Sequence, residues 1–224
     1  GVKHFEHFLT LPASDLSYGE LNQALRRKNQ INFPRNIDEY LAMLMLYFDY
    51  IADDPVLNSK FKKVVKKLAE SESSLSTTIH PLGSIAEETY FFTSMAPTPR
   101  AEVLMLSYTP AQKQQLKQAY VKMMKMLKYA HETGVKIRIG TDCREGGKAL
   151  LSELLLLYEA GFSIGEILQI ATINGSDALK IDEQYGTIEV GKKADLILFH
   201  QNPFDDYKHF LSEKTIIKGG QVIQ

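Results

Sequence analysis

Three short strand-like segments, separated by stretches of helical length, constrain the fold of this chain more than any other feature of its sequence. The first covers residues 2–7 and the second covers residues 74–80. In the third, residues 135–139, valine and isoleucine alternate with lysine and arginine, a pattern typical of a strand with two different faces. Strands joined by helix-length connections pair in parallel, whereas tight turns make antiparallel pairs. We therefore expect an α/β domain built on three parallel strands.

Helical periodicity fills the connections between these strands. Apolar residues recur there at spacings of three and four, which places them on one face of a helix. Asp38 is the expected N-cap of the first helix, and Thr109-Pro110 begins another with a capping-box pattern that Gly134 closes as a C-cap. The helices predicted in this way cover residues 38–51, 61–68, 109–134, 148–159 and 164–179.

The sequence pattern changes after residue 180. Short strand-like segments follow one another there, punctuated by Gly191, Asn202-Pro203 and Gly219-Gly220. We therefore expect an α/β body over residues 1–180 and a small β unit over residues 181–224. The strands predicted for the β unit cover residues 186–190, 195–199, 215–218 and 221–223.

Composition narrows the class of protein without naming a function. Hydrophobic residues make up 44% and charged residues 24%, as is ordinary for a soluble globular protein. The net charge of -1 gives no reason to expect a nucleic-acid or membrane partner. The single cysteine, Cys143, excludes an internal disulfide and leaves the cellular compartment open. Because the first residue is Gly1 rather than methionine, we expect the chain to be part of a longer protein.

Polar side chains at the predicted strand ends are the candidates for chemistry. In an α/β barrel, reactive groups project from the C-terminal ends of the parallel strands. His7, His80 and Asp142 occupy these three positions. Imidazole and carboxylate are both zinc ligands, and a carboxylate can also accept a proton from water. Taken alone, each signal is weak, since a strand-end Asp is more often a turn residue and a lone His a structural hydrogen-bonding group.

Several longer segments resemble a known family. They are IRIGTD, ELLLLYEAGFSIGEILQIATINGSDAL and YGTIEVGKKADLILFHQNP, and they resemble the amidohydrolase superfamily, most closely its imidazolonepropionase- and prolidase-like branch. The resemblance implies a TIM (β/α)8 barrel whose eighth strand ends at Asp142, followed by part of a small β-sandwich. The opening GVKHFEH resembles the sixth strand of the family and carries that strand's histidine onto His7, with His4 as the alternative. The chain would then hold the last three strand–helix units of the barrel.

The same resemblance implies hydrolysis of a carbon–nitrogen bond in a small amide or cyclic amide. One or two divalent metals, usually zinc, would polarise the carbonyl and supply hydroxide. Asp142 would be metal ligand and catalytic acid/base, and His7 would bind a second metal or, in a one-metal site, hydrogen-bond the substrate oxygen. His80 is a candidate substrate contact, with a structural role as the equal alternative.

The resemblance also implies missing parts. The family places a His-x-His motif on the first strand and a further His on the fifth, before the point at which this chain begins. We therefore expect this chain alone to be inactive, with metal absent or adventitious. Self-association is expected through exposed barrel-core residues such as Val2, Phe5, Val135, Ile137 and Ile139.

Two other interpretations stay open. The chain could be a half-barrel binding or assembly module whose partner supplies the other strands. It could instead be a metal-independent hydrolase in which His7, His80 and Asp142 form an acid–base group.

Overall fold

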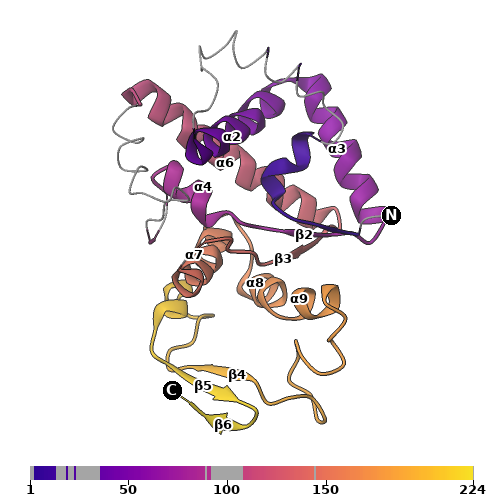
Figure 1. Cartoon of the computed structure of the whole chain (residues 1–224), viewed down its shortest axis with the longest axis vertical. Coiled ribbons are helices and arrows are strands. Elements are labelled where there is room, and N and C mark those ends of the chain that lie inside the picture. The colour runs from indigo at the N-terminus through magenta and orange to yellow at the C-terminus, as the bar shows by residue number, and fades with distance from the viewer. Residues whose placement is uncertain are drawn as a thin grey trace.

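A three-stranded parallel sheet organises the first part of the molecule (Figure 1). A computed structural model describes residues 3–13, 36–88, 90–91, 108–143 and 145–223, with the single residues 19 and 23. The sheet has the order β1-β2-β3, and its registers place His4 opposite Ser74 and Leu75 opposite Ile137. The predicted parallel pairing is confirmed; Val2 lies outside the described residues. The strands are β1 (His4–Phe5), β2 (Ser74–Ser76) and β3 (Lys136–Arg138).

All three strands are shorter than predicted, because the backbone turns left-handed shortly after each one. His7, Thr78 and Asp142 have φ angles of 63°, 52° and 41°, a region that non-glycine residues rarely adopt. A residue in this conformation cannot continue a strand. The predicted strand over residues 74–80 therefore stops at Ser76, and His80 becomes the first residue of a short helix instead of a strand end.

The helices follow the predicted order with shifted boundaries. Asn36, rather than Asp38, caps α2, since its side-chain oxygen accepts a hydrogen bond from the Glu39 amide at 2.9 Å. The capping box at Thr109 is confirmed, and Gly134 adopts a φ of 103° just after α6. The helices are η1 (Phe8–Ala13), α2 (Ile37–Asp53), α3 (Pro55–Glu70), α4 (His80–Ile85), α6 (Pro110–Glu132), α7 (Gly146–Glu159), α8 (Ile164–Ala171) and α9 (Ile173–Ala178).

The single helix predicted over residues 164–179 is wrong, because Thr172 divides it into α8 and α9. Thr172 has φ −130° and ψ −88°, and its hydroxyl donates to the Leu168 carbonyl at 2.6 Å. The break lets both short helices bond to the third strand and its end. The Ile139 amide donates to the α8 carbonyl of Ile170 at 3.2 Å, and the Asn174 side-chain amide of α9 donates to the Ile137 carbonyl at 2.6 Å.

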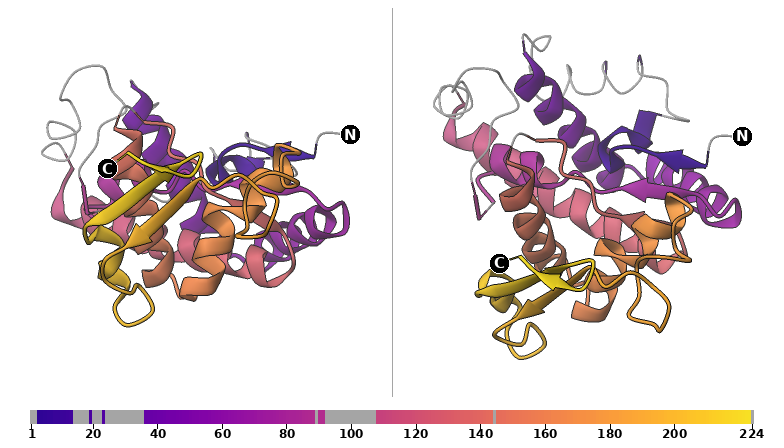
Figure 2. Two further views of the ribbon diagram at one scale, coloured as in Figure 1. Left: turned by 90° about the horizontal axis from the view of Figure 1, so that it is seen from below. Right: turned by 60° about the horizontal axis from the view of Figure 1, so that its bottom comes forward.

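One hydrophobic core joins the sheet to its helices. Leu75 and Ile137, at the centre of the sheet, are 1% and 0% exposed. The helices α8 and α9 lie beside β3 in both Figure 1 and Figure 2. The expectation that Val135 and Ile137 lack neighbours is therefore wrong, since both are buried within this chain.

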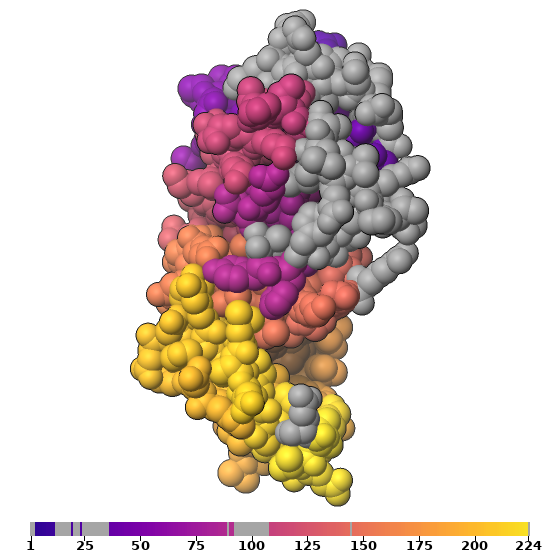
Figure 3. Space-filling model, turned by 90° about the vertical axis from the view of Figure 1, so that its left-hand side faces the viewer, coloured from indigo at the N-terminus to yellow at the C-terminus, as the bar shows by residue number. Residues whose placement is uncertain are grey.

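The predicted β unit is present as a small antiparallel sheet, drawn as arrows in Figure 1, and its residues fill one end of the molecule in yellow in Figure 3. The strand predicted over residues 186–190 does not form, and Ile188 and Val190 there are highly exposed. The unit is attached to α7 by a stack of Tyr158 on Tyr207, with ring centroids 4.3 Å apart. Its elements are β4 (Leu196–Phe199), η2 (Tyr207–Leu211), β5 (Lys214–Lys218) and β6 (Gln221–Val222).

Gly140 gives a direct test of how closely the second and third strands approach at their ends. In a Gly140→Ala variant, the new Cβ would overlap the Ser76 hydroxyl and lie 3.1 Å from Thr78 Oγ1. Ser76 is 1% exposed, so its hydroxyl has little room to turn aside. We expect urea denaturation to show a loss of about 1–3 kcal/mol in the free energy of unfolding. The control is Gly165→Ala in α8, where a Cβ meets nothing within 4 Å; equal losses in both variants would contradict the prediction.

Candidate active site

His7 and Asp142 come together at the C-terminal edge of the parallel sheet. His7 Nε2 lies 3.8 Å from Asp142 Oδ2, and the two side chains are 40% and 58% exposed. The other ring nitrogen, His7 Nδ1, is hydrogen-bonded to Thr78 Oγ1 at 3.2 Å. Of the three residues in left-handed conformations after the strands, His7 therefore lies close to both Thr78 and Asp142, and His7 and Asp142 face solvent.

Backbone hydrogen bonds fix the geometry of this edge. The Thr78 amide donates to the Gly140 carbonyl at 3.1 Å, and the Gly140 amide donates to Thr77 Oγ1 at 3.1 Å. The Thr77 amide continues the ladder to the Arg138 carbonyl at 3.0 Å. Left-handed non-glycine residues cost about 1–3 kcal/mol each and persist where surrounding contacts over-determine them, often at functional sites. Three of them at one edge make it the candidate active site.

The two exposed side chains suit a divalent metal as part of a ligand set. Two ligand atoms on a tetrahedral zinc, with bonds of about 2.0–2.2 Å, are separated by roughly 3.3–3.6 Å. The 3.8 Å between His7 Nε2 and Asp142 Oδ2 is near that separation. Within the described ranges, no group of three His, Cys, Asp or Glu side chains could hold a metal. The residues present thus supply two donors towards a site that ordinarily needs three or four.

An ion pair lies next to the site, along the same strands. Glu6 is paired with Arg138, whose guanidinium also donates to the Phe5 carbonyl at 3.3 Å and to Ser74 Oγ at 3.2 Å. The Arg138 hydrogen bond holds the pKa of the Glu6 carboxyl below its usual range. Glu6 is therefore an ionised structural partner of Arg138. His4, the alternative to His7, bonds to Ser74 through Nδ1 at 2.7 Å.

His80 lies in the interior. Its side chain is buried, the whole residue is 2% exposed, and Nδ1 is hydrogen-bonded to Ser152 Oγ of α7 at 2.9 Å. Burial lowers the pKa of the imidazole, which favours the neutral ring. This environment supports the structural role of His80, whereas its role as a substrate contact stays a prediction.

Glu153 is the residue that sequence reasoning missed. It lies on α7 and is 0% exposed, and its Oε1 accepts a hydrogen bond from the His80 amide at 2.7 Å. Burial raises the pKa of its carboxyl to about 8, although hydrogen bonds from Thr77 and from the amides of His80 and Ile79 act in the other direction. Its second oxygen, Oε2, has no hydrogen-bond partner among the described residues. The sequence feature that could have identified Glu153 is its position as a charged residue within the leucine-rich segment of residues 150–157.

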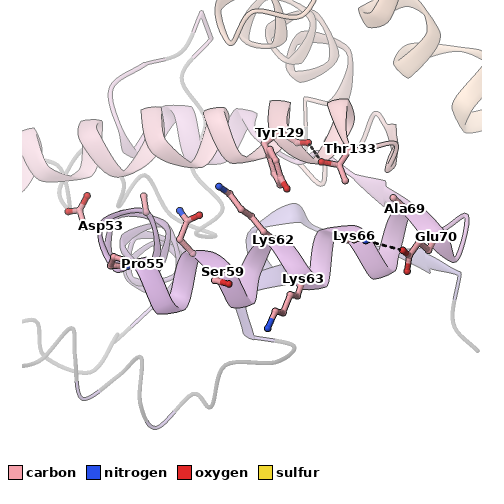
Figure 4. A pocket seen from close by; sticks show the side chains of 12 residues that line it. Asp53, Pro55, Ser59, Lys62, Lys63, Lys66, Ala69, Glu70, Tyr129 and Thr133 are labelled. Carbon is pink, nitrogen blue, oxygen red and sulfur yellow. Dashed lines mark hydrogen bonds and ion pairs between the residues drawn. The ribbon is translucent and has the colours of Figure 1, made fainter.

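A separate surface groove lies between α3 and α6 (Figure 4). Lys62 reaches across it, with Nζ 5.5 Å from the ring centroid of Tyr129, and Lys66 pairs with Glu70 at 3.8 Å. None of the strand-end side chains lines this groove. It results from helix packing and stands apart from the candidate active site.

The sequence model of the Amidohydrolase family matches residues 57–222. The chain belongs to the amidohydrolase family. Among curated relatives, it is 32% identical over 99 residues to an imidazolonepropionase of Brevibacillus brevis, covering 41% of this chain and 23% of the relative. It is 31% identical over 143 residues to a 5-methylthioadenosine/S-adenosylhomocysteine deaminase of Caldanaerobacter subterraneus, covering 52% and 31%. Human guanine deaminase is 30% identical over 113 residues, covering 45% and 24%.

Solved structures extend this match to the fold. A Xaa-Pro dipeptidase with bound methionine superposes with a TM-score of 0.54 at 20% identity, covering 85% of this chain and 50% of that one. The ochratoxinase of A. niger gives 0.53 at 20% identity, covering 86% and 46%. The predicted family and a TIM-barrel-like α/β fold are thus confirmed, and the chain spans about half the length of these structures. Among the described helices, none combines the length and hydropathy needed to cross a bilayer.

The buried carboxyl of Glu153 predicts a specific pH dependence of stability. Its pKa is about 8 in the folded chain against an ordinary value of 4.5, so the folded state retains a proton that the unfolded state releases. The free energy of unfolding should therefore fall between about pH 4.5 and pH 8, by up to about 1.4 kcal/mol per pH unit. It should then level off above the folded-state pKa.

Glu153→Gln is the matched control, because the amide cannot titrate. Urea denaturation from pH 4 to pH 9 measures both proteins, and their difference should decline across this window. The lowered pKa of His80 acts with the opposite sign in both proteins, so it cancels in the difference. Parallel curves for the two proteins would show that Glu153 does not retain its proton.

Proposed function

We propose that this chain forms part of the active site of a metal-dependent hydrolase that cleaves a carbon–nitrogen bond in a small amide or cyclic amide. The observation that carries the proposal is the approach of His7 Nε2 to Asp142 Oδ2 at 3.8 Å, at the C-terminal edge of a parallel sheet. Family membership supports a hydrolase, and two of the three curated relatives described above are deaminases by name. Substrates in this fold class bind at that edge of the sheet.

The side chains suggest how work is divided at the site. When bound, a divalent metal such as zinc polarises a carbonyl and lowers the pKa of water. Asp142, more than half exposed, is placed to accept a proton from the attacking water and return it to the leaving nitrogen. Water thus supplies hydroxyl to the carbon and hydrogen to the nitrogen. His7 offers Nε2 towards the same space, while Thr78 holds its Nδ1.

Replacement of Asp142 tests the chemistry. In the protein as its gene encodes it, Asp142→Asn should lower kcat/KM by at least about 10²–10⁴-fold, because a positioned acid–base group contributes that much. Turnover can be followed as product release from candidate substrates suggested by the names of the relatives. These substrates are imidazolonepropionate, guanine, 5-methylthioadenosine and an Xaa-Pro dipeptide. His7→Asn should lower activity as well.

The control for this test is Asp205→Asn, which removes an exposed carboxylate in the C-terminal unit. It should leave turnover unchanged. Near-normal activity of a folded, zinc-loaded Asp142→Asn protein would remove this residue from the mechanism.

We also propose how the chain maps onto the family fold. Residues 1–180 would hold strands six to eight of a TIM barrel as β1, β2 and β3, and residues 181–224 the C-terminal part of a composite β-sandwich. The parallel order of the three strands supports the first assignment. The exposed apolar residues of the C-terminal unit support the second, since a sandwich would cover them; they include Ile188, Val190, Ile197, Leu198, Val222 and Ile223.

This mapping predicts the behaviour of the 224-residue chain by itself. In the described sheet β1 and β3 are the two outer strands, and outer strands can pair with other chains. Because α8 and α9 already bond to the outer side of β3, β1 is the more open of the two. Together with the exposed apolar face of the C-terminal unit, the outer strands should cause self-association, and the chain alone should be inactive. Light scattering should report species larger than 25.3 kDa, and metal analysis should find less than one tightly bound zinc per chain. A stable monomer with one tightly bound zinc would contradict the proposal.

A further inference from the structure

Glu153 connects the helix that follows Asp142 to the turn that follows β2. It accepts the His80 amide proton at 2.7 Å, and it also interacts with the Thr77 side chain and the Ile79 amide. The residues on the turn side span 77–80, immediately after the second strand. A side chain on α7 thus fastens the turn that lies between the ends of β1 and β3.

That turn carries the contact that orients His7. Thr78 holds a φ of 52°, which is an outlier for a β-branched residue. Its hydroxyl bonds to His7 Nδ1 at 3.2 Å, while its amide bonds to the Gly140 carbonyl at 3.1 Å. A strained residue keeps such a conformation only when neighbouring contacts determine it. Glu153 supplies such contacts on either side of Thr78.

Stability alone does not explain a carboxyl at this position. Glu153 is fully buried, Oε2 has no hydrogen-bond partner, and no ion pair involves it within the described ranges. Glu153 bonds to the Thr77 side chain and to the His80 amide at the turn, and it interacts electrostatically with the Tyr120 hydroxyl of α6 and with Cys143 beside Asp142. An isolated buried carboxyl costs free energy that an apolar side chain of similar size would not. The leucines around Glu153 have no oxygen atom in their side chains and could not accept these hydrogen bonds from the turn.

We propose that Glu153 is a positioning residue of the candidate active site: by fixing the turn at residues 77–80, it holds the Thr78 hydroxyl against His7 Nδ1 and thereby directs Nε2 towards Asp142. The role in metal binding rests on the function proposed above. The geometric part does not, and it can be measured without substrate.

Three kinds of variant separate positioning from general stability. Glu153→Gln keeps an acceptor oxygen at the same reach, whereas Glu153→Leu removes it and Glu153→Asp withdraws it by one methylene. Thr78→Val removes the hydroxyl that contacts His7 and keeps the shape of the side chain. Leu155→Ala is the matched control, since Leu155 is equally buried on α7 and its loss leaves a cavity in the core.

Amide hydrogen exchange tests the geometric part in the protein as its gene encodes it. The amides of Thr78 and His80 should exchange at least about tenfold faster in Glu153→Leu, and at wild-type rates in Glu153→Gln and Leu155→Ala, when native conditions limit exchange to local opening. If Glu153→Leu does not fold, Glu153→Asp replaces it with the same expectation. Unchanged protection of both amides in the folded variant would overturn the proposal.

Zinc affinity, measured by competition with a chromophoric chelator, tests the consequence. Outer-shell partners of metal ligands typically contribute 10–100-fold in affinity. Thr78→Val and Glu153→Leu should each weaken zinc binding by about tenfold, and the double variant should be no weaker than either by more than about twofold. The proposal would be overturned if the double variant lost zinc affinity by the product of the two single losses. It would also be overturned if Thr78→Val weakened zinc binding and Glu153→Leu did not. If wild type binds no zinc, the proposed function fails, while exchange at Thr78 and His80 still decides whether Glu153 positions the turn.

Discussion

The close approach of the second and third strands at Gly140 is the contact on which the candidate active site depends. Only the absence of a side chain lets Ser76 and Thr78 lie against this position. The Gly140 carbonyl and amide then bond to Thr78 and Thr77 and pull the two strand ends together. Thr78 turns its hydroxyl to His7 from this position, which brings the ends of β1, β2 and β3 into one cluster.

Titratable side chains around this cluster fall into an exposed pair and a buried group with opposite electrostatic consequences. His7 and Asp142 are partly exposed and close to one another, so they can meet water, a metal and a substrate. His80 and Glu153 are buried behind them, where loss of hydration lowers the pKa of the imidazole and raises that of the carboxyl. Both shifts favour the neutral form, as expected for groups in a medium of low polarity. In the function proposed here, the chemistry therefore lies on the solvent side, and its support lies on the core side.

The sequence predicted the fold class well because its signals were local and periodic. The alternation at residues 135–139 and the capping box at Thr109 depend on near neighbours, and both elements form. The break at Thr172 was missed, because it follows from bonding of two short helices to β3, which no local pattern records. The strand predicted over residues 186–190 failed for a similar reason, since the described part of the chain offers it no partner strand.

The site was predicted in part. His7 and Asp142 were expected at strand ends, and the structure places them 3.8 Å apart. His80 was predicted to end the second strand because of its place in the strand order. The left-handed turn at Thr78 instead leads the chain into α4, where the His80 ring bonds to Ser152. Glu153 could not be assigned a role from sequence, because its contacts are to residues more than 70 positions away in the chain. Long-range contacts of this kind require the folded structure.

The central claim of the proposed function is that His7 and Asp142 belong to one metal-dependent active site. Anomalous diffraction at the zinc absorption edge, from crystals of the protein as its gene encodes it, tests this claim most directly. The account predicts an anomalous peak at zinc coordination distance, about 2.0–2.2 Å, from at least one of the two atoms Asp142 Oδ2 and His7 Nε2. Zinc bound elsewhere, with neither atom among its ligands, would contradict it.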